Sequence, residues 1–493
     1  MSALASETIG GLAPLIARGE VSPVELVEAS LERIEAHEPT LHAYVRVEPE
    51  SAVSAARDAE REIRGGRYLG PLHGIPVAVK DNFAVAGWPT TNGSRLMADH
   101  VTDFDAAIVE RLRAAGAIVL GKSNMHEWGM GGTCSGMHFG TVRNPWALDR
   151  VPGGSSGGSA AAVSAGLAYA AVGADGMGSI RTPASYCGVV GFKPTYGLIS
   201  RYGSLPPTSS WYDHAGPIAR DVKDAAILLS ALAGPDPRDP TSLAPPAGWG
   251  IDSGRLTLDV TGLRIAIPRT HFFEDATPVV REAVEAAAAT FVELGANVTE
   301  IELPSLAHVG LVLLGAQTEA HSFLVPLALA HPEGFASEEV RLSILATELV
   351  PHTAVRHALQ LRNLIRAQVS DAMREVDVLL TPTNSTTAFP IGAHSVEVGT
   401  QGGVVDLTKP RAQGRITTRL AWPFNVTGMP AISVPAAETD RGLPIGIQLA
   451  ARHWDEATLI RSAYAYEQAT SGGYRPPPLV VDGGPPAAEA VRG

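Results

Sequence analysis

Apolar and polar positions along this chain alternate between two periodicities, one typical of buried strands and one of amphipathic helices. The first predicted helix covers 23–36, where apolar residues recur at helical spacing. Ser22 is a suitable N-cap for this helix, and Glu25 completes a capping box. An apolar run from Ile75 to Val79 then predicts a buried strand that ends at Lys80.

The later segments continue this alternation. Further strands are predicted at 117–120, 168–173, 264–267, 297–302, 377–381, 431–435 and 444–450. Further helices are predicted at 104–115, 159–165 and 278–294, over most of 305–375, and at 455–469. This order favours an α/β fold with a mostly parallel or mixed sheet.

Two glycine-rich segments interrupt the pattern and each places a serine at the end of an element. Gly153–Ser159 precedes a predicted helix, so Ser155 lies just before a helix N-terminus. Asp175–Arg181 follows a predicted strand, so Ser179 lies just after a strand. Either segment alone is also typical of a structural turn, and the first of a phosphate-binding loop. It lacks the Gly-Lys-Ser/Thr ending of a P-loop, which argues against nucleotide binding.

A lysine completes the candidate chemistry. Lys80 follows an apolar strand, and burial lowers the pKa of a lysine toward the neutral form that a general base requires. The backbone N–H groups of Gly176, Met177, Gly178 and Ser179 can converge on one point, as in an oxyanion hole. These parts are sufficient for a serine nucleophile that needs no histidine, so we predict an acyl-transfer enzyme.

Composition excludes several other classes of function. The 493 residues are 45% hydrophobic and 18% charged, which suits a large core. The net charge of −13 argues against nucleic-acid binding, because phosphate contacts need clustered lysines and arginines. Cys134 and Cys187 fit free, buried thiols in a reducing compartment. The sequence shows no signal peptide, transmembrane run or metal-binding motif, so we expect a cytoplasmic protein without a membrane partner, cofactor or metal.

Several motifs, in a matching order, resemble the amidase signature family. The similarity covers about 10–470, more weakly at 240–370. The matching segments are Gly74–Asp81, Gly121–Met125, Arg143–Trp146, Gly153–Thr195, Gly216–Arg220, Pro430–Pro435 and Pro444–Gly446. A set of ordered motifs is far more specific than any one glycine motif. The resemblance implies an α/β fold with a central mixed, twisted sheet covered by helices on both faces.

The resemblance also assigns a role to each candidate residue. Ser179 matches the nucleophile that forms the acyl-enzyme, Ser155 the bridging serine held by a cis peptide bond, and Lys80 the general base. Ser156 and Ser159 are expected to orient Lys80 and Ser155 through hydrogen bonds.

The turn that precedes the nucleophile departs from the family pattern. The family commonly has Gly-Gly immediately before the nucleophile, whereas Met177 and Gly178 stand there in this chain. With Gly176 they are assigned to the oxyanion hole, and Met177 adds a side chain that is expected to shape the acyl pocket. Asp175 and Arg181 are expected to hold the loop rather than to react.

Substrate choice is predicted to depend on a glycine-rich loop at 128–135 and a variable helical stretch at 305–375. From the loop and the stretch we single out, respectively, Gly129, Met130, Gly131 and Gly132, and Leu311, Val312, Leu314 and Phe323. The loop has no charged residue, and the charges of the helical stretch are expected on its solvated faces. We therefore predict an uncharged, partly apolar small-molecule substrate.

Three functional hypotheses remain open within the family. The leading one is a free-standing amidase acting on amides, such as aryl amides, or on carbamates (urethanes), with esterase activity as a further option. The rival is the A subunit of a tRNA-dependent amidotransferase, which Lys193–Gly197 and Ser200–Gly203 resemble. Met177, the stretch 209–214 and the Pro-rich tail argue against it. The third is a catalytically silent, partner-binding member, disfavoured because the lysine and both serines are present.

The chain is expected to form one domain over 1–470. Its signature core is placed at about 70–220, and a loose Pro/Gly-rich tail at 471–493. A homodimer is left open as an assembly.

Overall fold

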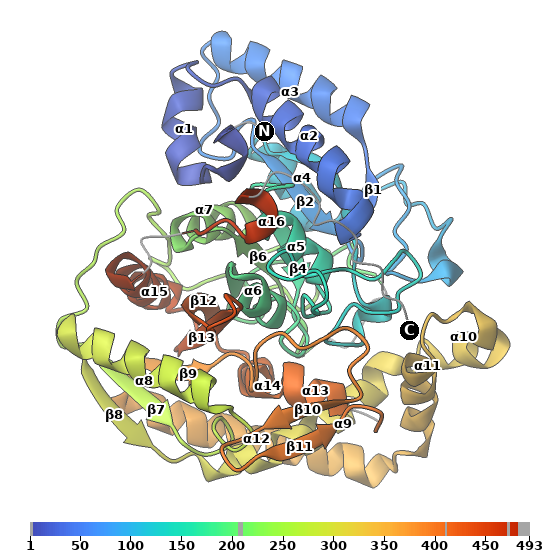
Figure 1. Cartoon of the computed structure of the whole chain (residues 1–493), viewed down its shortest axis with the longest axis vertical. Helices are drawn as coiled ribbons and strands as arrows, with labels where there is room; N and C mark the ends of the chain where they lie inside the picture. The colour runs from blue at the N-terminus through green and yellow to red at the C-terminus, as the bar shows by residue number, and fades with distance from the viewer. Residues whose placement is uncertain (1–2, 206–210, 410–411, 471–473, 482–493) are drawn as a thin grey trace.

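A single large sheet runs through the structure, a computed structural model that describes residues 3–205, 211–409, 412–470 and 474–481 (Figure 1). Its eleven strands are, in spatial order, β1 (Tyr44–Val47), β3 (Ile118–Ser123), β2 (Pro76–Lys80), β4 (Ala170–Ala174), β6 (Ala215–Ala219), β5 (Val190–Lys193), β12 (Ala431–Glu438), β13 (Pro444–Ala451), β9 (Val378–Pro382), β7 (Arg264–Pro268) and β8 (Asn297–Ile301). Strand β2 is parallel to β3 and β4, and β7 is parallel to β8 and β9. The other neighbouring pairs are antiparallel, so the sheet is mixed, as predicted. A separate hairpin pairs β10 (Ser395–Val398) with β11 (Gly403–Asp406).

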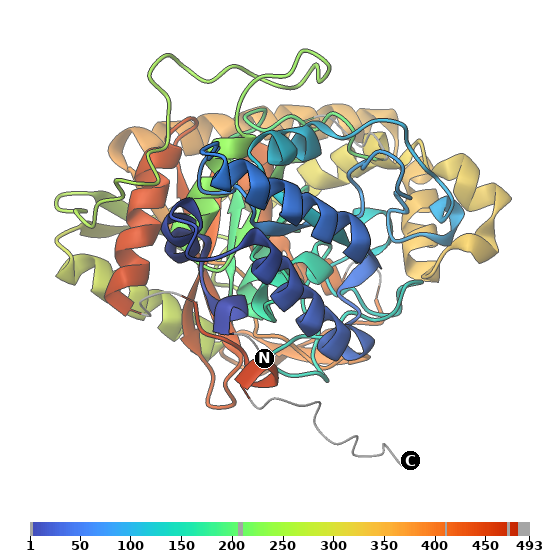
Figure 2. The same cartoon turned by 90° about the horizontal axis from the view of Figure 1, so that it is seen from above.

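Helices cover both faces of this sheet. Helices α4, α7, α15 and α8 pack one against the next along one face, while α5 and α6 pack against the middle strands from the other. Figures 1 and 2 both show α2 and α3 side by side near the N-terminus, and α10 and α11 at the periphery. The α-helices are α1 (Ile9–Ala17), α2 (Pro23–Leu41), α3 (Pro49–Arg64), α4 (Ala107–Ala114), α5 (Gly157–Ser164), α6 (Arg181–Cys187), α7 (Val222–Leu232), α8 (Pro278–Glu293), α9 (Val309–His321), α10 (Val325–Ala330), α11 (Glu338–Leu345), α12 (His352–Glu375), α13 (Ala412–Thr417), α14 (Trp422–Thr427), α15 (Glu456–Thr470) and α16 (Pro478–Val481). The 3-10 helices are η1 (Ala3–Ser6), η2 (Arg95–Met97), η3 (Glu127–Gly129), η4 (Pro304–His308), η5 (Pro332–Gly334), η6 (Ala346–Leu349) and η7 (Arg419–Ala421).

The predicted strands and helices are present near their predicted positions, whereas the apolar helices α1 and α7 were not predicted. The capping box at Ser22 and Glu25 is formed, although α2 continues beyond the predicted end to Leu41. The predicted helical stretch consists of several helices from η4 to α12. Strands β1, β5 and β6 were not predicted, because each is short and takes its place in the sheet through pairing with distant strands.

The C-terminal tail departs in part from the predicted loose segment. Residues 471–473 and 482–493 lie outside the described residues. Between them, α16 is formed, and the Tyr474 hydroxyl donates to the Ser164 carbonyl at 2.7 Å. This part of the tail is therefore held against the domain. The predicted single domain over 1–470 stays a prediction.

The carboxyl ends of three parallel strands meet at one edge of the sheet and position the candidate chemistry. Lys80 is the last residue of β2 and pairs in register with Ser123, the last residue of β3. On the other side, β2 is in register with β4, which ends at Ala174, just before the turn that contains Ser179. Crevices at the carboxyl ends of parallel strands are the common location of ligand sites in α/β sheets.

Helix α5 approaches this edge of the sheet more closely than a side chain would permit. A Cβ atom on Gly158 would lie 2.3 Å from the Asn124 carbonyl oxygen and 2.4 Å from that of Ala43. The small residues of α5 thus let the segment that contains Ser155 lie directly against the strand ends.

We expect Gly158→Ala to lower the thermal unfolding midpoint, because the added methyl group overlaps two backbone carbonyls and costs about 1–3 kcal/mol. Gly250→Ala is the matched control, since no atom lies within 4 Å of a Cβ at that position. Differential scanning calorimetry of both variants checks this. Equal midpoints for the two variants would contradict the close packing of α5.

Candidate active site

A buried lysine and a buried serine form the base of the site. Lys80 Nζ lies 2.7 Å from Ser155 Oγ and 3.4 Å from the carbonyl oxygen of Ala174. Burial lowers the pKa of Lys80 from its usual 10.5 to about 8, against the opposing charges of Asp213 and Asp175. A substantial fraction of Lys80 is therefore neutral near pH 8 and able to accept a proton from Ser155. The peptide bond between Gly154 and Ser155 is cis.

Ser179, from the glycine-rich segment 175–181, lines the same pocket as Lys80 and Ser155. Ser179 is 7% exposed, whereas Lys80 and Ser155 are each 1% exposed, so Ser179 is the more accessible of the two hydroxyl groups. The Ser156 N–H donates to the carbonyl of Ser179 at 3.1 Å, which ties the two segments together. The arrangement suits Ser179 to attack a substrate and Ser155 to link it to Lys80.

The turn 175–181, which carries the predicted nucleophile Ser179 and is called the nucleophile turn below, is closed by the buried carboxylate of Asp175. It accepts the backbone N–H groups of Gly178 at 2.7 Å and Ile180 at 3.2 Å. Arg181 donates Nε and Nη2 to it at 3.0 and 2.9 Å, and Asn425 donates Nδ2 at 2.9 Å. Burial alone raises the pKa of Asp175, but the charge and hydrogen bonds of Arg181 outweigh this and hold it well below its usual range. Asp175 and Arg181 therefore hold the loop.

One hydrogen bond in this turn reduces the number of backbone amides that can serve as the predicted oxyanion hole. The Gly178 N–H points to Asp175 Oδ1, so it is already engaged and is a poor donor to a substrate oxyanion. The amides of Gly176, Met177 and Ser179 are the remaining candidates among the four proposed from the sequence. Gly176 and Met177 line the pocket.

Ser156 and Ser159 were expected to orient Lys80 and Ser155 through hydrogen bonds, but their side chains bond to neighbouring groups instead. Ser156 Oγ donates at 3.2 Å to the Ala174 carbonyl, the same acceptor that Lys80 uses. Ser159 Oγ lies 2.6 Å from Ser123 Oγ at the end of β3. Both serines thus fix the backbone around Lys80 and Ser155. Ser123 lies in the matching segment Gly121–Met125. The sequence does not indicate its contact with Ser159, because that contact depends on the packing of α5.

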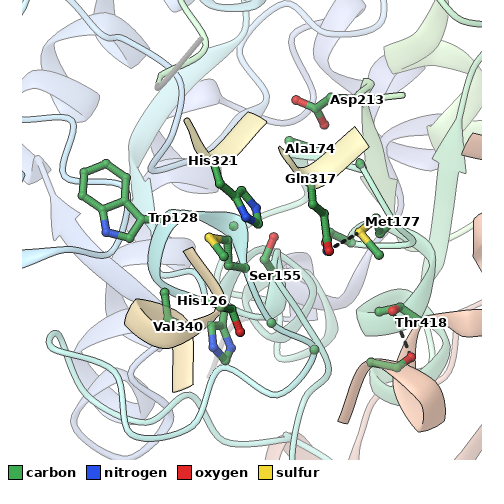
Figure 3. Close-up of a pocket in the computed structure, with 18 of the residues that line it drawn as sticks. His126, Trp128, Ser155, Ala174, Met177, Asp213, Gln317, His321, Val340 and Thr418 are labelled. Atoms are coloured by element: carbon green, nitrogen blue, oxygen red, sulfur yellow. Dashed lines mark hydrogen bonds between the residues drawn. The ribbon is translucent and has the colours of Figure 1, made fainter. Parts of the chain in front are cut away.

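These groups open into a pocket of about 300 Å³ (Figure 3). The glycine-rich loop, α9 and the segment 413–422 all contribute to its lining. The predicted loop residues Gly129, Met130, Gly131 and Gly132 all line it. A Cβ on Gly131 would lie 2.2 Å from the ring of His126, and one on Gly132 would lie 2.1 Å from Thr417 Oγ1, so the loop fits tightly between its neighbours.

The helical stretch 305–375 contributes to the pocket lining, but mostly through residues other than the four predicted from the sequence. Of the four predicted, Leu314 lines the pocket, Val312 lies in the core, and Leu311 and Phe323 are exposed. The face of α9 toward the pocket carries residues three, four or seven positions apart, namely Gly310, Leu313, Leu314, Gln317 and His321. The phase of a helix depends on tertiary packing, so the sequence could not select this face.

Charged side chains also line the pocket, whereas the charges of the helical stretch were predicted to lie on its solvated faces. Glu339 of α11 is exposed and belongs to the lining, so one charge of that stretch faces the pocket. Asp213 lines it too, and burial raises the pKa of this carboxyl above its usual value. Asp213 belongs to the stretch 209–214, of which residues 209 and 210 lie outside the described residues.

A histidine stabilises the loop but does not replace the lysine. The ring nitrogen Nδ1 of His126 accepts the backbone N–H of Cys134 at 3.1 Å. The backbone N–H of His126 donates to the Ser155 carbonyl at 3.0 Å. Burial lowers the pKa of His126 to about 4, so it is neutral at pH 7. Cys134 and Cys187 are both free and buried, as predicted.

The sequence matches the protein family described as Amidase over residues 25–460. The chain belongs to the amidase signature family. It is 39% identical to the A subunit of the glutamyl-tRNA(Gln) amidotransferase of Chloroflexus aurantiacus, over 98% of this chain and 100% of that protein. A structure described as a vestigial protein complex, which reveals the evolutionary origins of an s-triazine catabolic enzyme, is 32% identical with a TM-score of 0.87, covering 95% and 100% of the two chains. A bacterial aryl acylamidase of the amidase signature family is 28% identical with a TM-score of 0.85, covering 95% and 97%.

These similarities confirm the predicted family, the α/β fold and an amidase-type enzyme acting on C–N bonds. They leave the choice between a free-standing amidase and an amidotransferase subunit to the proposals below. The name of the Chloroflexus relative conflicts in part with the prediction that no nucleic acid is a partner. Among the described residues, no helix combines the length and apolarity needed to cross a membrane, and no three histidine, cysteine or acidic side chains gather as metal ligands.

The pH dependence of activity tests the state of Lys80. Because the base must be neutral, kcat/KM for a non-ionising anilide should rise with pH with a midpoint at about 8 and level off about one pH unit higher. Asp213→Asn removes a charge that raises the pKa of Lys80, so the midpoint should move to lower pH. Glu339→Gln, at an exposed position of the lining, is the control and should leave the midpoint in place. An unchanged midpoint in Asp213→Asn would argue against this electrostatic coupling.

Proposed function

We propose that this protein is a free-standing serine hydrolase that cleaves the C–N bond of uncharged, partly apolar amides, with aryl amides and carbamates as the preferred classes. The proposal depends above all on the 2.7 Å contact between Lys80 Nζ and Ser155 Oγ, beside Ser179 in one pocket. A buried amine with a lowered pKa next to a hydroxyl group is the arrangement that a serine nucleophile without histidine requires.

In the proposed reaction, neutral Lys80 takes a proton from Ser155 as Ser155 takes the proton of Ser179. The Ser179 oxygen bonds to the substrate carbonyl carbon, and the negative charge on the carbonyl oxygen is stabilised by the free amides of the turn. When the C–N bond breaks, Ser155 donates a proton to the leaving nitrogen and recovers one from Lys80. Water then attacks the acyl-enzyme by the same relay and releases the acid.

The pocket lining supports an uncharged substrate group next to the nucleophile turn. Gly310, Leu313, Leu314 and Trp422 lie on the α9 side of the pocket and carry no charge. Trp422 Nε1 donates to Thr418 Oγ1 at 3.0 Å, so its polar atom is already engaged. The charged groups Asp213 and Glu339 come from other segments of the lining.

Replacement of the three groups tests this mechanism. Ser179→Ala should abolish the acyl-enzyme, and Ser155→Ala and Lys80→Ala should each lower kcat at least about 100-fold because the proton relay is broken. The assay is a panel of anilides, primary amides, esters and carbamates, with the acyl-enzyme followed by mass spectrometry. Circular dichroism establishes that each variant is folded. An active Ser179→Ala enzyme would overturn the assignment, and highest activity on charged primary amides would overturn the substrate class.

The alternative function is that of the A subunit in a tRNA-dependent amidotransferase. It is favoured by the 39% identity to the Chloroflexus protein over nearly the whole of both chains. In that case the chain would need a second protein as its partner, and an acceptor for the released nitrogen. Co-purification of a stoichiometric partner, together with amide cleavage that requires that partner, would support this alternative. Full turnover by the isolated chain would support the free-standing enzyme. Failure of every acyl probe to modify Ser179 would favour the silent member.

A further inference from the structure

Of the three residues that precede Ser179, the two glycines have close neighbours, and a methionine stands between them. A Cβ on Gly176 would lie 3.1 Å from the ring of Tyr212, and one on Gly178 would lie 2.7 Å from the Cβ of Ala421. Gly178 also has a φ of 103°, which a residue with a side chain rarely adopts. Met177 lies outside this left-handed region and lines the pocket. Its side chain therefore enters the space that the substrate would occupy.

Helix α9 holds this methionine in place. Gln317 Nε2 donates to Met177 Sδ at 3.4 Å, and Figure 3 shows the two side chains meeting in the pocket beside Ser155. Gln317 lies one turn beyond Leu313 and Leu314 on the same helix face. Met177 and this face of α9 thus form one continuous wall, which we call the methionine wall. It consists of Met177, Leu313, Leu314 and Gln317.

The geometry of acyl transfer decides which part of the substrate meets this wall. A carbonyl carbon bound to Ser179 has three other substituents. Its oxygen must face the amides of the turn, and its nitrogen must lie within reach of Ser155 Oγ, the proton donor. Ser155 lies on the side of the glycine-rich loop, because a Cβ on Gly129 would be 3.7 Å from its Oγ. The third substituent, the chain or ring of the acyl group, takes the remaining space of the pocket, whose lining includes Met177 and the face of α9.

We propose that Met177, held by Gln317, selects acyl groups that are unbranched or planar at the atom bonded to the carbonyl. This inference rests on the proposed function and adds the shape of its substrate. A branch at that atom projects out of the plane and overlaps the methionine side chain. A linear alkyl, aryl or alkoxy group lies flat against it, and an aryl group also gains a favourable contact with the sulfur. Acetyl, benzoyl and carbamate substrates are accepted, whereas isobutyryl and pivaloyl substrates are rejected.

The test compares two methionines that line the same pocket from different sides. The substrates are the p-nitroanilides of acetic, benzoic, isobutyric and pivalic acids, which share one leaving group. The native enzyme should favour acetyl over pivaloyl by about 10-fold or more in kcat/KM, the usual effect of one or two misplaced methyl groups. Met177→Ala should remove most of this preference. Met130→Ala changes the glycine-rich loop, on the side of the leaving group that the four substrates share, so it should change kcat/KM by the same factor for all four and leave the ratio of acetyl to pivaloyl as it is.

A second variant tests the contact that holds the methionine. Gln317→Leu removes the N–H donor while keeping a side chain of similar size, so Met177 gains freedom and the preference should fall to an intermediate value. Discrimination that persists in Met177→Ala, or that is lost equally in Met130→Ala, would overturn the inference.

A separate readout distinguishes this inference from the proposed function. The p-nitrophenyl esters of the same four acids acylate a reactive serine without the need to protonate an amine, and mass spectrometry gives the rate of Ser179 modification. Selective acylation that depends on Met177, without cleavage of any anilide, would refute amide hydrolysis and uphold the methionine wall. Acylation of Ser179 at equal rates by all four esters would refute the wall alone. No acylation of Ser179 by any ester would refute both.

Discussion

The buried carboxylate of Asp175 is the constraint on which the site depends. It is fully enclosed, and it accepts hydrogen bonds from the backbone N–H groups of Gly178 and Ile180, from the guanidinium of Arg181 and from the side-chain amide of Asn425. An isolated carboxylate would be far too costly to bury, so each of these donors is required for the charge to remain inside. Removing one partner of such a pair typically costs about 3–5 kcal/mol. The position of Ser179 is thus set by electrostatics inside the protein, and contact with substrate is not needed to create it.

The same carboxylate gives the backbone amides of the turn different roles. Because Gly178 donates to Asp175, the turn has one amide that holds the backbone, flanked by residues that line the pocket. Gly178 is required by a close neighbour and a positive φ, and a Cβ at Gly176 would press on the ring of Tyr212, whereas Met177 has no positive φ. Variation at this one position can therefore alter the pocket without disturbing the frame that holds the nucleophile.

The sequence predicts the site better than it predicts the pocket around it. Lys80, Ser155 and Ser179 stand at the ends of apolar elements, and local pattern and motif order are enough to place them. Asn425 and Gln317 lie far along the chain and show no local signal, because their roles come from packing of α14 and α9 against the turn. Short strands such as β5 and β6 escape prediction for the same reason, since pairing across the sheet decides their conformation.

The far partners of Arg181 have a consequence for the newly synthesised chain. Its guanidinium also donates to Gln448 Oε1 at 2.6 Å, on β13, and to Asn425 Oδ1 at 2.7 Å. Lys80, Ser155 and Ser179 are all translated well before either partner. The hydrogen bonds that hold the turn around Ser179 are complete only when α14 and β13 are in place, so we expect the candidate site to take its final form late in folding.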